Sequence, residues 1–188
     1  MKERKAHMNV KPDTALLIID VINHFQFEYG SSLQEQSIQL LPSLLQLKEK
    51  AKNTQIPIIY INDHYNLWQA DFKKIIRHCT TTANKDYLMQ IKPNEDDYFL
   101  IKPKHSAFYG TALNTLLFHL KIKKLIITGI AGNICVLFTA NDAYMRDYKL
   151  YCPKDCIASV NEQDNMYALT MMKNVLKANI TVSNQLLL

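Results

Sequence analysis

Short runs of consecutive apolar residues alternate along the chain with longer segments in which apolar residues recur at helical spacing. Runs such as "TALLIID" and "KLIITG" are apolar throughout, which is typical of strands buried on both faces of a parallel sheet. The pattern predicts strands at 14–20, 57–61, 97–102, 124–129, 149–152 and 180–183. It predicts helices at 32–53, 111–121, 134–147 and 162–177.

This alternation predicts a doubly wound α/β fold, because each right-handed crossover lays its helix on a face of the sheet. We expect a single domain over residues 1–188, with about residues 1–12 as an N-terminal tail. Its architecture should be a three-layer α/β/α sandwich around a mostly parallel, six-stranded, Rossmann-like sheet. The stretch 63–96 is the least regular and predicts one or two short helices in an excursion that covers a pocket.

Composition narrows the class of protein further. A chain of 188 residues that is 48% hydrophobic and has only four glycines is neither disordered nor repetitive. The net charge of +5 is scattered and shows no basic face typical of nucleic-acid binding. The apolar runs are too short to cross a bilayer, and the first residues lack an apolar signal core. We therefore expect a soluble, cytoplasmic protein without nucleic-acid or membrane partners.

Four cysteines, at 79, 135, 152 and 156, are too few and too unevenly spaced for a disulfide framework. Reduced thiols are the better interpretation. Cys152 and Cys156 lie four residues apart, but no second pair completes a zinc site. No C-x-x-C motif or resolving cysteine lies near Cys135, so redox chemistry is disfavoured.

Three chemically active residues follow the ends of predicted strands. Asp20 ends the first strand, Lys102 ends the third, and Cys135 follows the fourth in the first turn of the next helix. In an open α/β sheet, ligands bind outside the carboxyl ends of the strands, near the point where strand order reverses. The sequence therefore predicts a carboxylate, an ammonium and a thiol at one edge of the sheet.

These three groups together suit nucleophilic catalysis. A helix N-terminus and a nearby cation lower the pKa of a thiol, and a carboxylate can accept its proton and return it to a leaving amine. Backbone N–H groups before the helix can stabilise an oxyanion. Each residue also has a structural interpretation: a packing cysteine for Cys135, a capping aspartate for Asp20 and a solvated lysine for Lys102. Their convergence on one edge is what favours catalysis.

Three blocks, "TALLIIDVINHF", "IKPKHSAFYGTAL" and "LIITGIAGNICVLFTANDAYMRDYKLYCPKDCIAS", resemble the isochorismatase-like cysteine hydrolases in order and spacing. By motif, the resemblance implies a catalytic triad of Asp20, Lys102 and the nucleophile Cys135. It also implies a cis peptide between Ile130 and Ala131, with the N–H groups of Ala131 and Cys135 turned toward a common oxyanion. A homo-oligomer, dimer or larger, is a further implication.

The resemblance also bears on the reaction. Members named for isochorismate cleavage do not need this cysteine, so Cys135 favours hydrolysis of a C–N bond in a small amide or carbamoyl compound through a thioester. No cofactor is expected. Two alternatives stay open: vinyl ether hydrolysis of the isochorismate type that uses Asp20 without covalent catalysis, and a catalytically silent α/β domain that binds a metabolite or a protein.

Nicotinamidases of this family bind a metal through an aspartate and two histidines, the first two spaced Asp-x-His. The corresponding region here has Asp63 and His64 adjacent, with no further histidine before His78. Adjacent residues on an extended segment point to opposite sides and make a poor pair of ligands. We therefore predict no metal site, and a metal-free subgroup whose substrates the resemblance does not supply.

Aromatic residues near the three blocks are candidates for the walls of a small substrate pocket. These are Phe25, Trp68, Phe108 and Tyr109. Each also has the simpler interpretation of core packing. His24 and His105 flank the blocks and are candidates for substrate contact, although neither has the spacing of a partner for the thiol.

Overall fold

A six-stranded sheet forms the centre of the protein, in a computed structural model that describes residues 12–186. The tail expected at about residues 1–12 lies outside these residues except for Pro12. The strands are β1 (Thr14–Ile19), β2 (Ile58–Asp63), β3 (Tyr98–Lys102), β4 (Lys124–Ile130), β5 (Lys149–Tyr151) and β6 (Ile157–Ala158). Every pair is parallel, and the strand order is β3-β2-β1-β4-β5. The short β6 pairs with the carboxyl end of β4, past the residues of β4 that pair with β5. The strand order reverses between β1 and β4.

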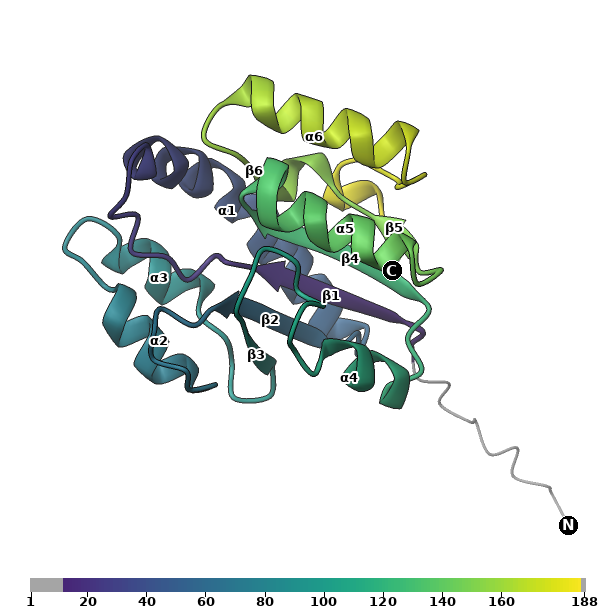
Figure 1. The fold of residues 1–188 in the computed structure, drawn as a ribbon, viewed down its shortest axis with the longest axis horizontal. Helices are drawn as coiled ribbons and strands as arrows, with labels where there is room; N and C mark the ends of the chain where they lie inside the picture. The colour runs from purple at the N-terminus through teal and green to yellow at the C-terminus, as the bar shows by residue number, and fades with distance from the viewer. Residues whose placement is uncertain (1–11, 187–188) are drawn as a thin grey trace, which may run out of the picture.

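Helices cover both faces of this sheet (Figure 1). They are α1 (Gly30–Asn53), α2 (Phe72–Cys79), α3 (Lys85–Ile91), α4 (Leu113–His119), α5 (Leu137–Tyr144) and α6 (Glu162–Asn174). Buried residues of α1, α2 and α3 pack on one face, and those of α4, α5 and α6 pack on the other. The predicted three-layer α/β fold is therefore confirmed. Within residues 12–186, no helix is long and apolar enough to cross a membrane.

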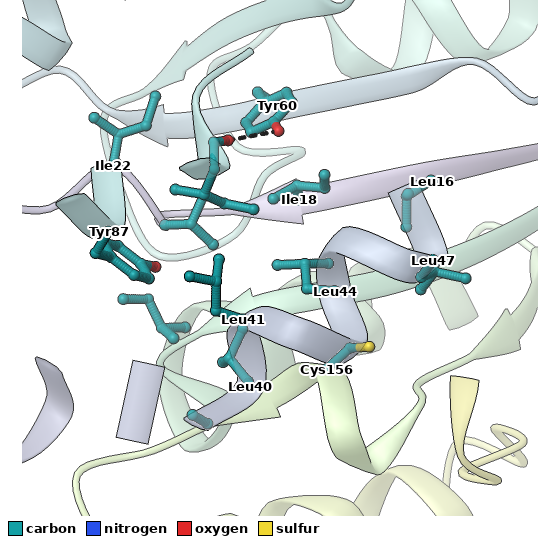
Figure 2. Packing of buried hydrophobic residues seen from close by; sticks show 14 of the residues in the cluster. Leu16, Ile18, Ile22, Leu40, Leu41, Leu44, Leu47, Tyr60, Tyr87 and Cys156 are labelled. Atoms are coloured by element: carbon teal, nitrogen blue, oxygen red, sulfur yellow. Dashed lines mark hydrogen bonds between the residues drawn. The ribbon is translucent and has the colours of Figure 1, made fainter. Parts of the chain in front are cut away.

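Alternate residues of the central strands enter two separate cores. In β1, Leu16 and Ile18 face the α1 side, and Leu17 and Ile19 face the α4 side, all fully buried. Figure 2 shows the first core, where leucines of α1 approach Leu16 and Ile18. These leucines are Leu40, Leu41, Leu44 and Leu47. The uniformly apolar strands of the sequence are thus explained by burial on both faces.

Most predicted elements agree with the structure to within a few residues. The irregular stretch 63–96 contains the two short helices α2 and α3. Between them and the sheet, the buried Tyr60 hydroxyl donates to the Ile91 carbonyl at 2.8 Å, the dashed contact in Figure 2. This bond satisfies a polar group that β2 would otherwise bury without a partner.

The strand predicted at 180–183 is wrong. The chain makes a single bridge there, between Asn179 and Tyr151 of β5. It then turns, because the Asn179 side chain accepts from the Thr181 N–H at 2.9 Å, and Asp155 accepts from the Ser183 N–H at 2.8 Å. The sixth strand is instead β6, whose two residues are too few for apolar periodicity to reveal.

Gly129 holds β4 against β1 at the carboxyl edge of the sheet. Its φ of +109° is in the left-handed region, and it pairs with Ile19 of β1. A Cβ at this position would collide with the Ile19 backbone nitrogen and carbonyl. Only glycine allows the two strands to approach this closely beside Asp20 and Ala131.

We predict that Gly129→Ala lowers the free energy of unfolding by more than about 2 kcal/mol, because both the backbone angle and the contact with β1 are incompatible with a side chain. Urea denaturation at neutral pH measures this. Gly110→Ala is the matched control: Gly110 has φ +65°, but its added Cβ would meet only the Pro103 ring. We expect a loss of about 1 kcal/mol for it. Equal losses for the two variants would contradict the role given to β1.

Candidate active site

Asp20, Lys102 and Cys135 come together at the carboxyl edge of the sheet. The Lys102 Nζ lies 2.8 Å from Asp20 Oδ2 and 3.4 Å from Cys135 Sγ. The Lys102 and Asp20 side chains are only 3% and 9% exposed. Lys102 also donates to the Lys104 carbonyl at 3.2 Å. One ammonium therefore joins the carboxylate, the thiol and the loop that follows β3.

Asp20 owes its position to the loop that follows β1. Its φ of +53° turns the chain sharply as the strand ends. Asp20 Oδ1 accepts from the Asp63 N–H at 2.9 Å, which ties the carboxylate to the end of β2. The buried Asn62 side chain bonds both the N–H and the carbonyl of Ile22, at 3.1 and 3.0 Å. The end of β2 therefore holds both the carboxylate and the loop that follows it.

Cys135 lies in a π-helical turn, Gly132–Val136, that connects β4 to α5. The helix predicted at 134–147 thus begins as this turn, a feature common at functional sites. The Thr139 hydroxyl donates to the Cys135 carbonyl at 2.7 Å and accepts from the Ala107 N–H at 2.9 Å. It therefore fastens the turn that contains Cys135 to the loop that follows β3. The peptide bond between Ile130 and Ala131 is cis.

A cavity of about 520 Å³ opens above the three groups. Asp20, Lys102, Cys135, Ile130 and Ala131 line it, so the structure brings these site residues together. The remaining lining residues come from the end of β2, the start of α1, the loops after β1, β2, β3 and β4, and the segment after β6. They are Asn23, His24, Phe27, Leu33, Asp63, Tyr65, Pro103, Lys104, His105, Ile134 and Val160.

The four aromatic residues expected to wall the pocket do not line this cavity. Phe25 is buried in one core, where its ring meets Tyr87 edge-on at 5.9 Å. Phe108 is buried in the other core, beneath the guanidinium of Arg146.

Trp68 and Tyr109 are exposed to solvent instead. Trp68 stacks on His64, with ring centroids 3.9 Å apart. The prediction of pocket walls from aromatic residues near the motifs was therefore wrong. Such a residue turns toward the core or toward solvent according to its local backbone, which the sequence does not reveal.

Other residues supply the walls in their place. Phe27 replaces Phe25 as the aromatic wall from the loop after β1. Tyr65 lies on the cavity and donates its hydroxyl to the Ile22 carbonyl at 3.0 Å. Lys104 also lines the cavity and was not predicted from the sequence. The sequence signal that could have identified these residues is their position, since each lies a few residues beyond a strand end or its flanking motif.

Both histidines that flank the motifs line the cavity. His105 Nδ1 is 3.9 Å from Cys135 Sγ, and its ring lies 5.5 Å from that of Phe138. His24 packs against Tyr65 and His78, with ring centroids 5.1 and 6.3 Å away. Burial, together with the nearby His78, lowers the pKa of His24. His105 thus borders the thiol, and His24 lines the cavity from the loop after β1.

The electrostatics differ from the sequence expectation for the thiol. Burial raises the pKa of Cys135, the Asp20 carboxylate raises it further, and the Lys102 ammonium opposes them. The expected lowered pKa is therefore wrong, because desolvation and a second charge outweigh the cation. For Lys102, burial acts to lower the pKa, but Asp20 and Cys135 outweigh it and the pKa is raised. The raised pKa favours a protonated Cys135 thiol at neutral pH, beside the salt bridge of Lys102 and Asp20.

The other cysteines are free and buried. Burial raises the pKa of each, namely Cys79, Cys152 and Cys156, to about 12. Cys135 is the partly exposed one of the four. A reagent in solution should therefore reach Cys135 first.

Asp63 and His64 do not fit the metal site of the family's nicotinamidases. Asp63 Oδ1 accepts from the Tyr65 N–H at 2.7 Å, and His64 Nδ1 accepts from the Asn66 N–H at 2.9 Å. His64 is also stacked on Trp68. In the described part of the chain, no group of three acidic, histidine or cysteine side chains could hold a metal ion. Freedom from a metal stays a prediction.

The sheet and the cavity at its switch point define a doubly wound α/β protein with a site at the carboxyl edge. Comparison with known proteins identifies the family within this fold class. Residues 14–184 match the isochorismatase domain, so the chain belongs to the isochorismatase family of hydrolases.

The relatives agree with this family over nearly the whole chain. It is 59% identical to the uncharacterized isochorismatase family protein YaaI of Bacillus subtilis, over 94% of this chain and 98% of YaaI. An isochorismatase-like hydrolase from Alkaliphilus metalliredigens superposes with a TM-score of 0.74 at 26% identity, over 92% of this chain and 87% of that one. The nicotinamidase SaPncA of Staphylococcus aureus gives 0.71 at 25% identity, over 90% and 98%.

We predict that Asp20→Asn makes Cys135 more reactive, because it removes a negative charge that raises the thiol's pKa. A pKa lower by one unit gives about ten times more thiolate below that pKa, so alkylation should quicken about tenfold. Rates with iodoacetamide between pH 6 and 10, read by mass spectrometry of the Cys135 peptide, measure this.

Lys102→Met provides the opposite change. It removes the charge that lowers the pKa of Cys135, so alkylation should be slower than in the unmodified protein at every pH. In the unmodified protein, the rate should still be rising at pH 10. A plateau near neutral pH would show that the cation dominates after all.

Proposed function

We propose that this protein is a cysteine amidohydrolase that cleaves a C–N bond in a small amide or carbamoyl compound. The observation that carries the proposal is the contact of one buried ammonium with both a carboxylate and a thiol, at 2.8 and 3.4 Å, on the floor of a cavity. The structural likeness to a nicotinamidase, an enzyme named for an amide, supports the same reaction type.

In the first half of the proposed reaction, Cys135 Sγ attacks the carbonyl carbon of the substrate. Asp20 accepts the thiol proton as the S–C bond forms, so the thiol need not be ionised beforehand. The carbonyl oxygen becomes an oxyanion, and the N–H groups of Ala131 and Cys135 are assigned to stabilise it. The C–N bond then breaks, and the proton held by Asp20 goes to the departing nitrogen.

In the second half, a water molecule attacks the thioester carbon, and Asp20 takes one of its protons. The C–S bond breaks, the acid leaves, and the proton on Asp20 returns to Cys135. Lys102 keeps its proton throughout, since its pKa is raised above the ordinary value. Its role is to hold Asp20 and to balance charge as the thiolate forms and disappears.

The ion pair is compatible with two other functions. A vinyl ether hydrolase of the isochorismate type would use Asp20 and would not require Cys135. A silent binding domain would require none of the three. The partly exposed thiol beside the ion pair favours the covalent reaction, because a binding cavity gains nothing from that combination. The homo-oligomer and the cytoplasmic location stay predictions.

We predict that the protein releases ammonia from at least one member of a panel of small amides and carbamoyl compounds, including nicotinamide and N-carbamoyl amino acids. Cys135→Ala should lower kcat/KM at least about 1000-fold, because no other group can form the thioester. Asp20→Asn should lower it about as much, because proton transfer loses its acceptor. A coupled ammonia assay measures both.

A mass increase of Cys135 by one acyl group in a quenched reaction would identify the thioester. Cys152→Ala is the matched control: Cys152 is fully buried away from the cavity, and this variant should still turn over. Undiminished ammonia release by Cys135→Ala would contradict covalent catalysis. Isochorismate cleavage that survives Cys135→Ala but not Asp20→Asn would favour the vinyl ether reaction instead.

A further inference from the structure

We infer that the substrate carries a negatively charged group on its acyl part and that Lys104 binds this group. The inference rests on the proposed amide hydrolysis and assigns to it a class of substrate. It follows from how charges are distributed around the cavity, where one ammonium and one carboxylate are left without an ionic partner.

Lys104 is the cation concerned. Two lysines line the cavity, and the first of them, Lys102, is already paired with Asp20 at 2.8 Å. Lys104 forms no salt bridge with any residue in the range 12–186. Its carbonyl accepts from Lys102 Nζ at 3.2 Å, so its backbone is fixed beside the reacting groups while its side chain stays exposed. An ammonium placed in this way is available to a ligand.

Negatively charged side chains lie at the ends of β1 and β2. There the Asp63 N–H donates to Asp20 Oδ1 at 2.9 Å, and the Asp63 side chain borders the cavity. Asp63 likewise has no salt-bridge partner within the described chain. Two carboxylates favour the N–H groups of an amide and repel an anion. The leaving nitrogen therefore belongs on the side of Asp20 and Asp63.

These two sides orient the substrate across the thiol. His105, the residue after Lys104, has its Nδ1 3.9 Å from Cys135 Sγ, so the loop after β3 that carries Lys104 borders the nucleophile. With the nitrogen toward the carboxylates, the acyl chain extends toward Lys104. Phe27, Leu33 and Ile134 supply apolar walls around about 520 Å³, which suits a short chain that ends in a carboxylate.

Matched amides of one length and different charge test this inference. Succinamate, butyramide and β-alaninamide are anionic, neutral and cationic, and malonamate and glutaramate extend the anionic series by one carbon each way. We expect kcat/KM to be highest for an anionic member and lowest for β-alaninamide. A hydrogen bond to a charged group is typically worth about a 10- to 100-fold preference, which added salt should weaken.

Lys104→Met should reduce the ratio of kcat/KM for the best anionic amide over butyramide about 10-fold or more, and Lys104→Arg should largely preserve it. Lys121→Met, an exposed lysine outside the cavity, should leave the ratio unchanged. A ratio that Lys104→Met does not alter, or a preference for butyramide or β-alaninamide, would overturn the inference while leaving the hydrolase proposal intact.

Binding provides a readout independent of catalysis. Titration calorimetry of Cys135→Ala with malonate, succinate and glutarate should detect a dicarboxylate that binds more weakly when Lys104→Met is added. If no amide is hydrolysed but this Lys104-dependent binding is found, the hydrolase proposal fails and the anion site stands. If no dicarboxylate binds and no anionic amide is preferred, the anion site is refuted.

Discussion

The ion pair between Asp20 and Lys102 is the interaction on which the arrangement of the site depends. Both side chains are almost entirely buried, and burying two charges costs several kcal/mol for each ion unless geometry and hydrogen bonds compensate. Here the compensation is explicit: the Asp63 N–H donates to the carboxylate, and the ammonium donates to the Lys104 carbonyl. Because such pairs seldom add net stability, a pair retained on the floor of a cavity is better explained by chemistry than by folding.

This pair also requires the particular order of the sheet. Asp20 follows β1 and Lys102 ends β3, with β2 between them, so the lysine reaches across the end of β2 to the carboxylate. Cys135 approaches from the other side, through β4, whose close contact with β1 depends on Gly129. The adjoining loops are sharply turned, since several of their residues have left-handed backbone angles. These are Asp20, Phe25, Tyr29, Tyr65, Asn66 and Trp68. Buried amides such as Asn62 hold these loops in place.

The sequence predicts the parts of this design that depend on chain order and periodicity. Apolar runs locate five of the six strands, and the residues at strand ends identify Asp20, Lys102 and Cys135 because parallel strands present their carboxyl ends at one edge. Properties that depend on the three-dimensional surroundings of a residue cannot be predicted from the sequence in this way. Phe25 and Phe27 are indistinguishable by pattern, yet Phe25 enters the core and Phe27 lines the cavity. The direction of the Cys135 pKa shift likewise depends on burial and on the distance to Asp20.

Because the pKa of Cys135 is raised, the proposed reaction depends on the Asp20 carboxylate to accept the thiol proton. A cysteine activated only by a cation would be ionised before substrate arrives and open to oxidation or alkylation. Here burial and Asp20 favour the protonated thiol, so in the proposed reaction the attack of Cys135 depends on a coupled proton transfer. In the same proposal, this proton is then available on Asp20 for the departing nitrogen. Lys102 contacts both Asp20 and Cys135, so the proposed reaction uses the carboxylate, the ammonium and the thiol together.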